Sequence, residues 1–277
     1  PCILEAFIDF WYKEYLINIL SKCFIIVIIF TTGIYMVERS HLNEIHKKLG
    51  ARFTEFAGFE MPMHFSSIKD EHLTVRKSVG LFDVSHMSNV WITGEDAEKL
   101  ISFTTLENAS NITDKKSQYT AILREDGTVI DDTIFMHLGD KFMMIPNAGM
   151  AETVTKWLNE KAEEYSICAT AENVSKDFVI LAIQGPKSRE TLQKLTETDL
   201  KTVGFFGCQY IDIAGINCII SHTGYTGELG FELNITPPKK AENIFLKILD
   251  AGKEFGIKPI GLGARDTLRL EKSFILA

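Results

Sequence analysis

The feature that most constrains this chain is a strand–turn–strand pattern that carries two adjacent aspartates. Residues 118–123 and 128–137 have strand-like patterns and flank a Glu-Asp-Gly turn at residues 125–127. Such a turn between two strand-like runs predicts a β-hairpin. Asp131 and Asp132 lie on the second strand, where neighbouring side chains point to opposite faces. One carboxylate should therefore face inward, beside apolar side chains, and the other outward.

A carboxylate that faces inward must shift its pKa or find a hydrogen-bonding partner. A fold can keep a general acid or an ion-pairing group inside a pocket in this way. The alternative is that Asp131 and Asp132 form the shoulder of a hairpin and cap the neighbouring turn. The pair by itself leaves both interpretations open.

Length and charge limit the class of protein. A chain of 277 residues fits one large domain or two modest ones. The formal net charge is −8, without a run of lysine and arginine, and this excludes a general nucleic-acid binder, which must neutralise phosphates. The five cysteines form neither a C-x-x-C pair nor a ligand-like spacing with histidine. The sequence therefore predicts no disulfide framework and no metal site, and it suits a reducing compartment.

Residues 1–35 differ in character from the rest. The run Phe24–Phe30 is entirely apolar and residues 23–36 carry no charge, but this is shorter than the roughly 20 apolar residues that span a bilayer. Extending the run toward the N-terminus includes Lys22. Three alternatives stay open: a membrane anchor or uncleaved signal, a native helical extension, or non-native sequence before a start at Met36. We expect no membrane association unless this segment is native.

Caps, turns and periodicity predict the remaining elements. Strands and helices alternate irregularly, with hairpins instead of regular βαβ units, and this favours an α+β fold with antiparallel sheets and flanking helices. Residues 53–65 are predicted to be irregular. We expect helices over residues 38–49, 67–79, 94–103, 153–164, 238–255 and within 261–274, one more beginning near Pro186, and further strands over 90–93, 141–145, 178–183, 210–213, 217–221 and 231–235.

Five motifs in a fixed order closely resemble the aminomethyltransferase (T-protein) family of the glycine cleavage system. No single motif is decisive, but the ordered set is specific. The resemblance extends from about Ser40 to Ala277 and also covers residues 50–52, 56–58 and 61–62. The motifs are Phe82-Asp83-Val84-Ser85-His86-Met87, Ile130-Asp131-Asp132, Gln184-Gly185-Pro186, Thr223-Gly224-Tyr225-Thr226-Gly227-Glu228 with Gly230-Phe231-Glu232, and Gly261-Leu262-Gly263-Ala264-Arg265-Asp266 with Arg269-Leu270-Glu271.

The resemblance implies a domain organisation. Residues 36–87 and 176–277 would form a discontinuous folate-binding domain around an inserted ferredoxin-like domain at residues 88–175. Members of the family continue beyond the position of Ala277 into a barrel-like domain that closes the folate channel. With that domain absent, we expect the folate pocket to be more open.

The resemblance also implies a reaction. The family moves a methylene carbon from the aminomethyl-lipoyl arm of a carrier, the H-protein, to tetrahydrofolate and releases ammonia. Tetrahydrofolate would be the co-substrate and lipoylated H-protein the protein partner, with no metal and no nucleic acid. We expect a cytoplasmic protein of bacterial type.

Three residues match the polar positions that matter most in the family. Asp132 matches the key acidic residue, which lies near the reactive folate nitrogens and is suited to orient the cofactor and assist proton transfer. Glu232 matches a glutamate that holds the pterin ring, since a carboxylate can accept from two neighbouring donors. Arg265 matches a folate-contacting arginine; its alternative is an ion pair with Asp266 or Glu271 on the last helix.

The same resemblance implies further residues of the folate cavity. Tyr119, Asn147 and Tyr225 match ring-packing and polar contacts of the folate cavity, although each residue type is more often found in a core or a turn. His86 belongs to a motif that lines the pocket in the family and is not expected to be catalytic. Phe205 stands where relatives often have tyrosine, so a hydroxyl is lost there.

Other classes of protein would require features of their own. A related folate-binding protein that assists iron–sulfur enzymes would carry a Lys-Gly-Cys motif, and this tripeptide does not occur. The folate-binding domain of a dimethylglycine or sarcosine oxidase would need a flavin domain upstream, which residues 1–35 cannot supply. An inactive truncated remnant that keeps only the fold is the remaining alternative.

Overall fold

The computed structural model describes residues 37–276, and from Glu38 onward the chain forms one compact unit. The alternatives for residues 1–35 lie outside the described residues. Within the described part, no helix is long and apolar enough to cross a membrane. The predicted α+β class is confirmed: helices flank sheets that are mainly antiparallel, and none of the sheets in residues 37–276 closes into a barrel.

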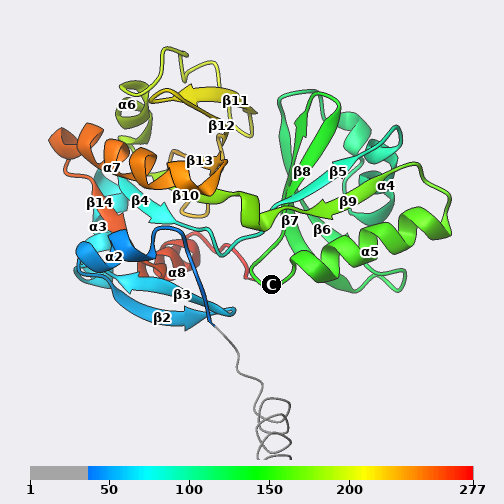
Figure 1. Ribbon diagram of the computed structural model, residues 1–277, viewed down its shortest axis with the longest axis horizontal. Coiled ribbons are helices and arrows are strands. Elements are labelled where there is room, and N and C mark those ends of the chain that lie inside the picture. Colours follow the sequence, from blue (N-terminus) through cyan, green and yellow to red (C-terminus); the bar gives the residue numbers. More distant parts are fainter. Residues whose placement is uncertain (1–36, 277) are drawn as a thin grey trace, which may run out of the picture. The chain divides into compact units, whose positions relative to one another are not determined.

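The largest sheet has six strands and lies on the left in Figure 1. All of its neighbouring strands are antiparallel except the last pair, β4 and β14, which is parallel. The strand order is β11 (Cys208–Ile213), β12 (Ile216–Ser221), β13 (Gly230–Ile235), β10 (Val179–Gln184), β4 (Gly80–Asp83) and β14 (Lys258–Ile260).

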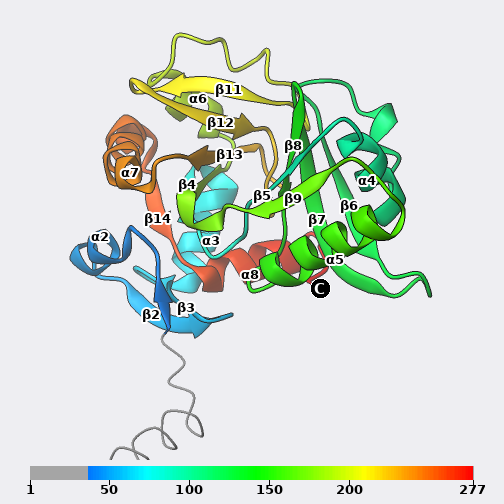
Figure 2. The same cartoon turned by 45° about the vertical axis from the view of Figure 1, so that its right-hand side comes forward.

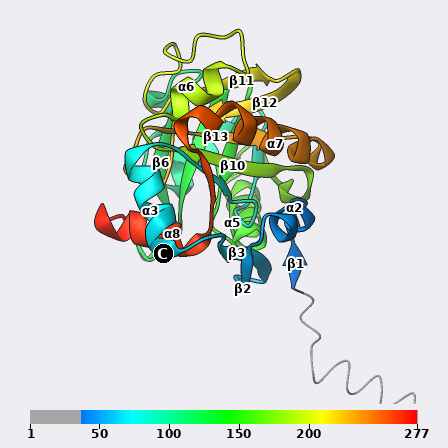
Figure 3. The same ribbon diagram turned by 90° about the vertical axis from the view of Figure 1, so that its left-hand side faces the viewer.

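The two faces of this sheet bury different elements. Phe231, Leu233 and Ile235 of β13 pack with buried residues of α6 (Ser188–Gln193) and α7 (Ala241–Ala251). Side chains alternate along β10, so Ile180 and Ala182 face the other way and pack with α3 (Ile68–Lys77) and α8 (Leu262–Glu271). Helices α3 and α8 lie side by side (Figure 3). Because residue 232 lies between two residues of the first face, its side chain shares the face that carries α8.

A five-stranded antiparallel sheet stands beside the first. Its order is β6 (Ser117–Leu123), β7 (Val129–Leu138), β8 (Lys141–Ile145), β5 (Val90–Thr93) and β9 (Thr170–Asn173). Helices α4 (Ala97–Thr104) and α5 (Ala151–Glu164) cover one face through a cluster that includes Ile92, Phe135 and Leu158. The predicted hairpin of β6 and β7 is confirmed.

The other face of the five-stranded sheet packs against the six-stranded sheet. Met136 and Met143 contact Phe178, Cys208 and Ile219 in one buried cluster. Figure 2 shows the result: α6 and α7 lie outside the first sheet, α4 and α5 lie outside the second, and the two sheets meet between them. Polar side chains at this junction come from segments that are far apart in the sequence.

The five-stranded sheet uses strands within residues 90–173, and the six-stranded sheet uses strands from both sides of that segment. This arrangement is compatible with a discontinuous domain at residues 36–87 and 176–277 around an inserted ferredoxin-like domain at 88–175. The division stays a prediction, because the chain from Glu38 onward is one compact unit.

Two local predictions near the N-terminus are wrong. The expected helix over residues 38–49 is only α2 (Asn43–Lys48), since β1 (Glu38–Arg39) pairs in parallel with β3 (Phe59–His64). The stretch expected to be irregular is a hairpin of β2 (Arg52–Phe56) and β3. Its turn places Ala57 and Gly58 at φ values of 48° and 83°, and alanine rarely adopts that conformation.

The later predictions hold within a few residues. Helix α3 begins after Ser67, whose side chain accepts a hydrogen bond from the Asp70 amide, and it ends at Lys77, two residues before the predicted Val79. Helix α7 is flanked by short 3₁₀ turns, η3 (Pro238–Lys240) and η4 (Lys253–Phe255), so the predicted helix over 238–255 is interrupted at its ends. Strand β14 was not predicted, because three residues that include Pro259 carry no strand pattern.

Candidate functional site

The adjacent aspartates of β7 occupy opposite faces, as the alternation predicts. Asp131 is 2% exposed and lies on the face covered by α4 and α5, where Phe135 also packs. Asp132 is partly exposed on the face that meets the six-stranded sheet. Burial raises the pKa of Asp131, and the charge of Asp132 acts in the same direction, against the hydrogen bonds from Asn147.

Asn147 joins the two carboxylates. It follows β8 and continues the register that pairs Ile134 with Ile145, so it lies opposite Asp132. Its backbone N–H donates to Asp131 Oδ2 at 2.9 Å, and its Nδ2 lies 2.9 Å from Asp131 Oδ1 and 2.8 Å from Asp132 Oδ1. Asp131 therefore does not cap the hairpin turn; it binds the residue that also binds Asp132.

Tyr119 supplies a second donor to Asp132. Its hydroxyl donates to Asp132 Oδ2 at 2.8 Å across the β6–β7 ladder. Burial, the hydrogen bond to Asp132 and the nearby negative charges raise the pKa of Tyr119 to about 12. The phenol thus stays protonated at neutral pH and remains a donor. The Asp132 carboxylate is held at one oxygen by Asn147 and at the other by Tyr119.

Glu232 lies on β13, on the face shared with α8. Its carboxylate accepts a hydrogen bond from Thr223 Oγ1, and Ser221 Oγ lies 2.7 Å from the same hydroxyl. Burial raises the pKa of Glu232, while the hydrogen bond from Thr223 and the charge of Arg265 oppose that rise. Glu232 is a partly exposed carboxylate with a single hydrogen-bond donor among the described side chains.

Arg265 projects from the first half of α8. Its guanidinium carbon lies 4.6 Å from the ring centroid of Tyr225, which is within the range of a cation–π contact. Burial lowers the pKa of Arg265, and Tyr225 and Glu232 counteract that shift. The alternative ion pair with Asp266 or Glu271 is not formed: Asp266 pairs with Arg269 and Glu271 with Arg76.

Helix α8 is held at its start by a buried carboxylate. Glu71 is fully buried and accepts hydrogen bonds from the backbone amides of Phe65, Ser66 and Gly261, at 2.7, 2.8 and 2.8 Å. Gly261 precedes the first residue of α8. The carboxylate thereby fixes the entry of the helix that carries Arg265.

The glycine-rich loop between β12 and β13 closes around Gln184. A Cβ atom at Gly224 or Gly230 would stand 2.1 or 2.2 Å from the Gln184 side chain, so both positions require glycine. The Gln184 amide donates to the Thr223 carbonyl at 3.1 Å and accepts from Thr226 Oγ1 at 2.8 Å. The Gln-Gly-Pro motif and the glycine motif are therefore two halves of one structure, and Tyr225 lies at its centre.

Arg76 ties this loop to α8. Its Nη1 donates to the Thr226 carbonyl at 2.5 Å and to Glu228 at 3.0 Å. Its Nη2 donates to the Leu268 carbonyl at 3.1 Å, and its Nε lies 2.6 Å from Glu271. The sequence analysis missed Arg76, because its partners lie 150 to 195 residues away.

His86 and Phe205, also named in the sequence analysis, lie in apolar or exposed surroundings. His86 is buried and neither ring nitrogen has a hydrogen-bond partner among residues 37–276. Burial, followed by the charge of Arg265, lowers the pKa of His86 to about 3, so the ring is neutral and does not act as a base here. Phe205 is 74% exposed and packs edge-on against Phe206.

A buried serine–histidine–aspartate group around Asp83 of the first motif superficially resembles a hydrolase triad. Ser40 Oγ and His46 Nε2 both contact Asp83 Oδ2, at 2.5 and 2.8 Å. The serine therefore donates to the aspartate and not to the histidine, which is not the arrangement that activates a nucleophile. The group ties the segment before α2 to β4.

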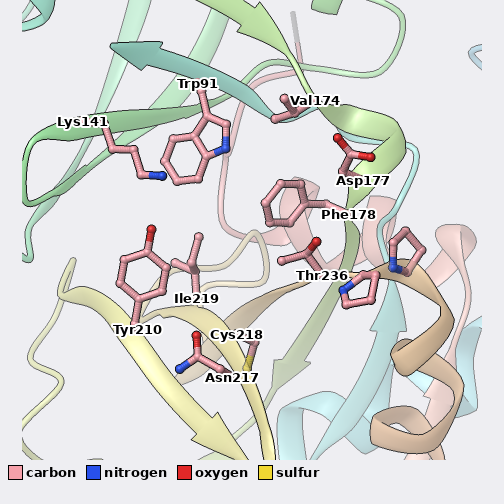
Figure 4. Close-up of a pocket in the computed structure, with 12 residues that line it drawn as sticks. Trp91, Lys141, Val174, Asp177, Phe178, Tyr210, Asn217, Cys218, Ile219 and Thr236 are labelled. Atoms are coloured by element: carbon pink, nitrogen blue, oxygen red, sulfur yellow. The ribbon is translucent and has the colours of Figure 1, made fainter. Parts of the chain in front are cut away.

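A separate cavity of about 380 Å³ is lined by residues of both sheets (Figure 4). Trp91, Lys141, Phe178 and Tyr210 are among its lining residues, and the Lys141 ammonium stands 3.9 Å from the Trp91 ring centroid. None of the predicted site residues lines it. No group of three or more histidine, cysteine, aspartate or glutamate side chains in the described part of the chain is arranged to hold a metal ion.

The structure thus brings the predicted residues into one neighbourhood. Hydrogen bonds link Tyr119, Asn147 and Asp132. Arg265 lies against the ring of Tyr225, and its charge opposes the rise in the pKa of Glu232. Burial raises the pKa of Tyr225; the charges of Arg265 and Arg269 oppose that rise, and the charge of Asp132 adds to it. Fold and site together define an α+β protein with two polar groups. One is Asp132 with Tyr119 and Asn147 on the five-stranded sheet, and the other is Glu232 with Arg265 and Tyr225 beside the six-stranded sheet.

Comparison with known proteins identifies the family. Residues 42–277 match the family model described as the GCVT N-terminal domain. Over 231 residues the chain is 42% identical to the aminomethyltransferase of Saccharopolyspora erythraea, covering 83% of this chain and 62% of that protein. Over 237 residues it is 42% identical to the aminomethyltransferase of Caldanaerobacter subterraneus subsp. tengcongensis, covering 85% and 63%. The chain belongs to the aminomethyltransferase (GCVT) family.

Solved structures agree with this assignment. The crystal structure of glycine cleavage system aminomethyltransferase T from Bartonella henselae superposes with a TM-score of 0.79 at 31% identity, covering 87% of this chain and 64% of that one. A heterotetrameric sarcosine oxidase from Corynebacterium sp. U-96 shares the fold at 15% identity and a TM-score of 0.50. The chain spans less than two thirds of the length of the aminomethyltransferases that it matches.

Proposed function

We propose that this chain binds tetrahydrofolate and takes part in aminomethyl transfer in glycine cleavage. The methylene carbon would pass from the aminomethyl-lipoyl arm of the H-protein to tetrahydrofolate, with release of ammonia. The observation that carries the proposal is the contact of Arg265 with the Tyr225 ring, on the sheet face that also carries Glu232, in a chain that belongs to the aminomethyltransferase family.

The residues present fit a folate. A pterin ring offers adjacent N–H donors, a carbonyl acceptor and a flat face. Glu232 is a partly exposed carboxylate to which the described side chains supply one donor, Thr223, so it can accept from ligand donors. Arg265 is partly exposed, has no ion-pair partner among the described residues and can donate to a carbonyl or a carboxylate. Tetrahydrofolate supplies the ring nitrogens that take up the one-carbon unit.

Asp132 is the proposed catalytic residue. Asn147 and Tyr119 fix its two oxygens at 2.8 Å, so the carboxylate holds one orientation while it remains partly exposed on the face toward the other sheet. A carboxylate held in this way can take or return a proton at a nitrogen and stabilise positive charge that develops nearby. Tyr225, with Arg265 against its ring, would form the aromatic wall of the same site.

Calorimetry of tetrahydrofolate binding tests the proposal. We expect the wild-type chain to bind and Glu232→Ala to weaken binding tenfold or more, about 1.4 kcal/mol. Asp132→Asn should bind with a smaller loss but fail to release ammonia when lipoylated, aminomethylated H-protein is added. Glu172→Ala is the matched control, because Glu172 is an exposed strand glutamate on β9. Absence of binding by the folded wild-type chain would refute the proposal for this chain.

The same assay separates the proposal from its alternatives. A folate-binding relative without transferase activity would bind tetrahydrofolate with the same dependence on Glu232 and release no ammonia from the carrier. An inactive remnant would unfold cooperatively but show no saturable binding. Ammonia release that depends on both tetrahydrofolate and Asp132 is the result that only a transferase gives.

A further inference from the structure

Asp131 is a buried carboxylate that Asn147 binds at both oxygens. Its Oδ2 accepts from the backbone N–H of Asn147 and its Oδ1 from the side-chain amide of Asn147, both at 2.9 Å. No ion pair reaches it in the part of the chain that the structure describes. Its strand neighbours on the same face, Thr133 and Phe135, are fully enclosed, so a hydrophobic side chain would suit this position better.

The contacts fix which way the Asn147 carboxamide points. Its Nδ2 is surrounded by three acceptors: Asp131 Oδ1 at 2.9 Å, Asp132 Oδ1 at 2.8 Å and the Asp132 carbonyl at 2.9 Å. A carboxamide oxygen could not occupy that place, because it would meet three acceptors without a proton between them. The amide oxygen therefore points away from the aspartates, and no hydrogen bond within residues 37–276 engages it.

A buried carboxylate costs stability, and this one is retained without a cation. Its negative charge gives Nδ2 of Asn147 a stronger acceptor than a neutral group would. Since a carboxylate accepts at both oxygens, it can hold the backbone N–H and the side-chain N–H of Asn147 together. An asparagine at position 131 would keep one of these bonds and oppose the other with its own amide group.

We propose that Asp131 is a positioning residue that acts through Asn147: it fixes the Asn147 carboxamide, and Asn147 in turn holds the Asp132 carboxylate toward the site. A consequence is that Asn147 presents only an acceptor outward, so a ligand group beside it must donate. This inference rests on the proposed function for its effect on binding, but the Asp131–Asn147 contact can be tested without any ligand.

A double-mutant cycle tests the inference, because residues that act through one another are non-additive. The variants are Asp131→Asn, Asn147→Ala and the pair, compared by tetrahydrofolate affinity in calorimetry. We expect each single variant to weaken binding about tenfold and the double variant to bind no more weakly than Asn147→Ala. An additive loss, roughly a hundredfold, would overturn the inference. Asp140→Asn is the control, since Asp140 is an exposed aspartate at the end of the same strand pair.

A second readout needs no ligand. The side-chain amide protons of Asn147, assigned by their loss in Asn147→Ala, should be protected from exchange with water in the wild-type chain. Asp131→Asn should expose them to exchange and Asp140→Asn should not. Urea unfolding should show that Asp131→Asn is less harmful in the Asn147→Ala background, because it then removes a carboxylate that has lost its side-chain donor and keeps only the backbone N–H of residue 147.

The two proposals fail in different ways. If the wild-type chain binds no tetrahydrofolate, the proposed function is refuted, and the amide exchange and the unfolding cycle still decide the Asp131–Asn147 coupling. If the Asn147 amide protons exchange at the same rate with and without Asp131, the positioning role is wrong whatever the chain binds.

Discussion

Replacing Arg76 with alanine should lower the free energy of unfolding by about 3–5 kcal/mol and weaken ligand binding at the loop that carries Tyr225. Arg76 lies on α3 and is 15% exposed at its side chain. It is the only described side chain that we find bonded to both the glycine-rich loop, at Thr226 and Glu228, and the last turns of α8, at Leu268.

The magnitude follows from its separate contacts. Hydrogen bonds from a charged donor to the carbonyls of Thr226 and Leu268 contribute roughly 1.5 kcal/mol each at the low end of their range. The pair with Glu271 contributes little, about 0–1 kcal/mol, because that carboxylate is 53% exposed. The pair with Glu228 is more enclosed and adds a similar amount. Arg76→Lys should retain about half of the total, since an ammonium cannot reproduce the planar fork of donors.

Equilibrium urea unfolding, followed by tryptophan fluorescence, measures the change. Lys253→Ala is the control, because the Lys253–Asp250 pair is exposed at both ends and should contribute almost nothing. Calorimetry of the same variants should rank tetrahydrofolate affinity as wild type, then Arg76→Lys, then Arg76→Ala. A loss below about 0.5 kcal/mol for Arg76→Ala, no larger than that of an ordinary surface substitution, would refute the reasoning.

Three further predictions concern the same site. Burial raises the pKa of Glu232, so just above pH 4.5 the folded chain still holds a proton that the unfolded chain has released. Stability therefore falls as pH rises through that range. Glu232→Gln should unfold at a higher urea concentration than wild type at pH 7, and it should bind tetrahydrofolate more weakly. Gly230→Ala would place a Cβ atom 2.2 Å from Gln184 Nε2 and should cost about 1–3 kcal/mol in urea unfolding, whereas alanine at exposed Gly139, which has free space around it but a positive φ, should cost less. The lowered pKa of His86, about 3, should keep its ring resonances in the neutral form from pH 8 to pH 5 in NMR titration; a midpoint near 6.5 would show that the ring is not buried as described.

Local patterns predicted much of the fold. The hairpin of β6 and β7 follows from its turn and its strand-like runs, and the start of α3 follows from the Ser67 cap. The same reasoning failed where a partner strand decided the outcome. Residues 38–39 pair with β3, and the three residues of β14 become a strand because β4 lies beside them.

Some residues of the candidate site could also be recognised from the sequence, and others could not. Asp132, Glu232 and Arg265 were recognised from ordered motifs, and the roles assigned to them stay predictions. The importance of Arg76 and Glu71 could not be read from the sequence, because a charged residue on an amphipathic helix usually faces solvent. Asp131 was expected to face away from Asp132, which is confirmed, but its hydrogen bonds to Asn147 were not foreseen.

The sequence by itself determined the family, the α+β class and the opposite faces of Asp131 and Asp132, because motif order and a two-residue strand period are local properties. Only the tertiary structure decided which groups meet. Sheet order places Asn147 beside both aspartates, the packing of α8 on the face of β13 places Arg265 near Glu232, and the joining of the loop to α8 depends on Arg76. Hydrogen bonds act over about 3 Å, so the partners of a buried polar group are set by how distant segments pack and not by their spacing along the chain.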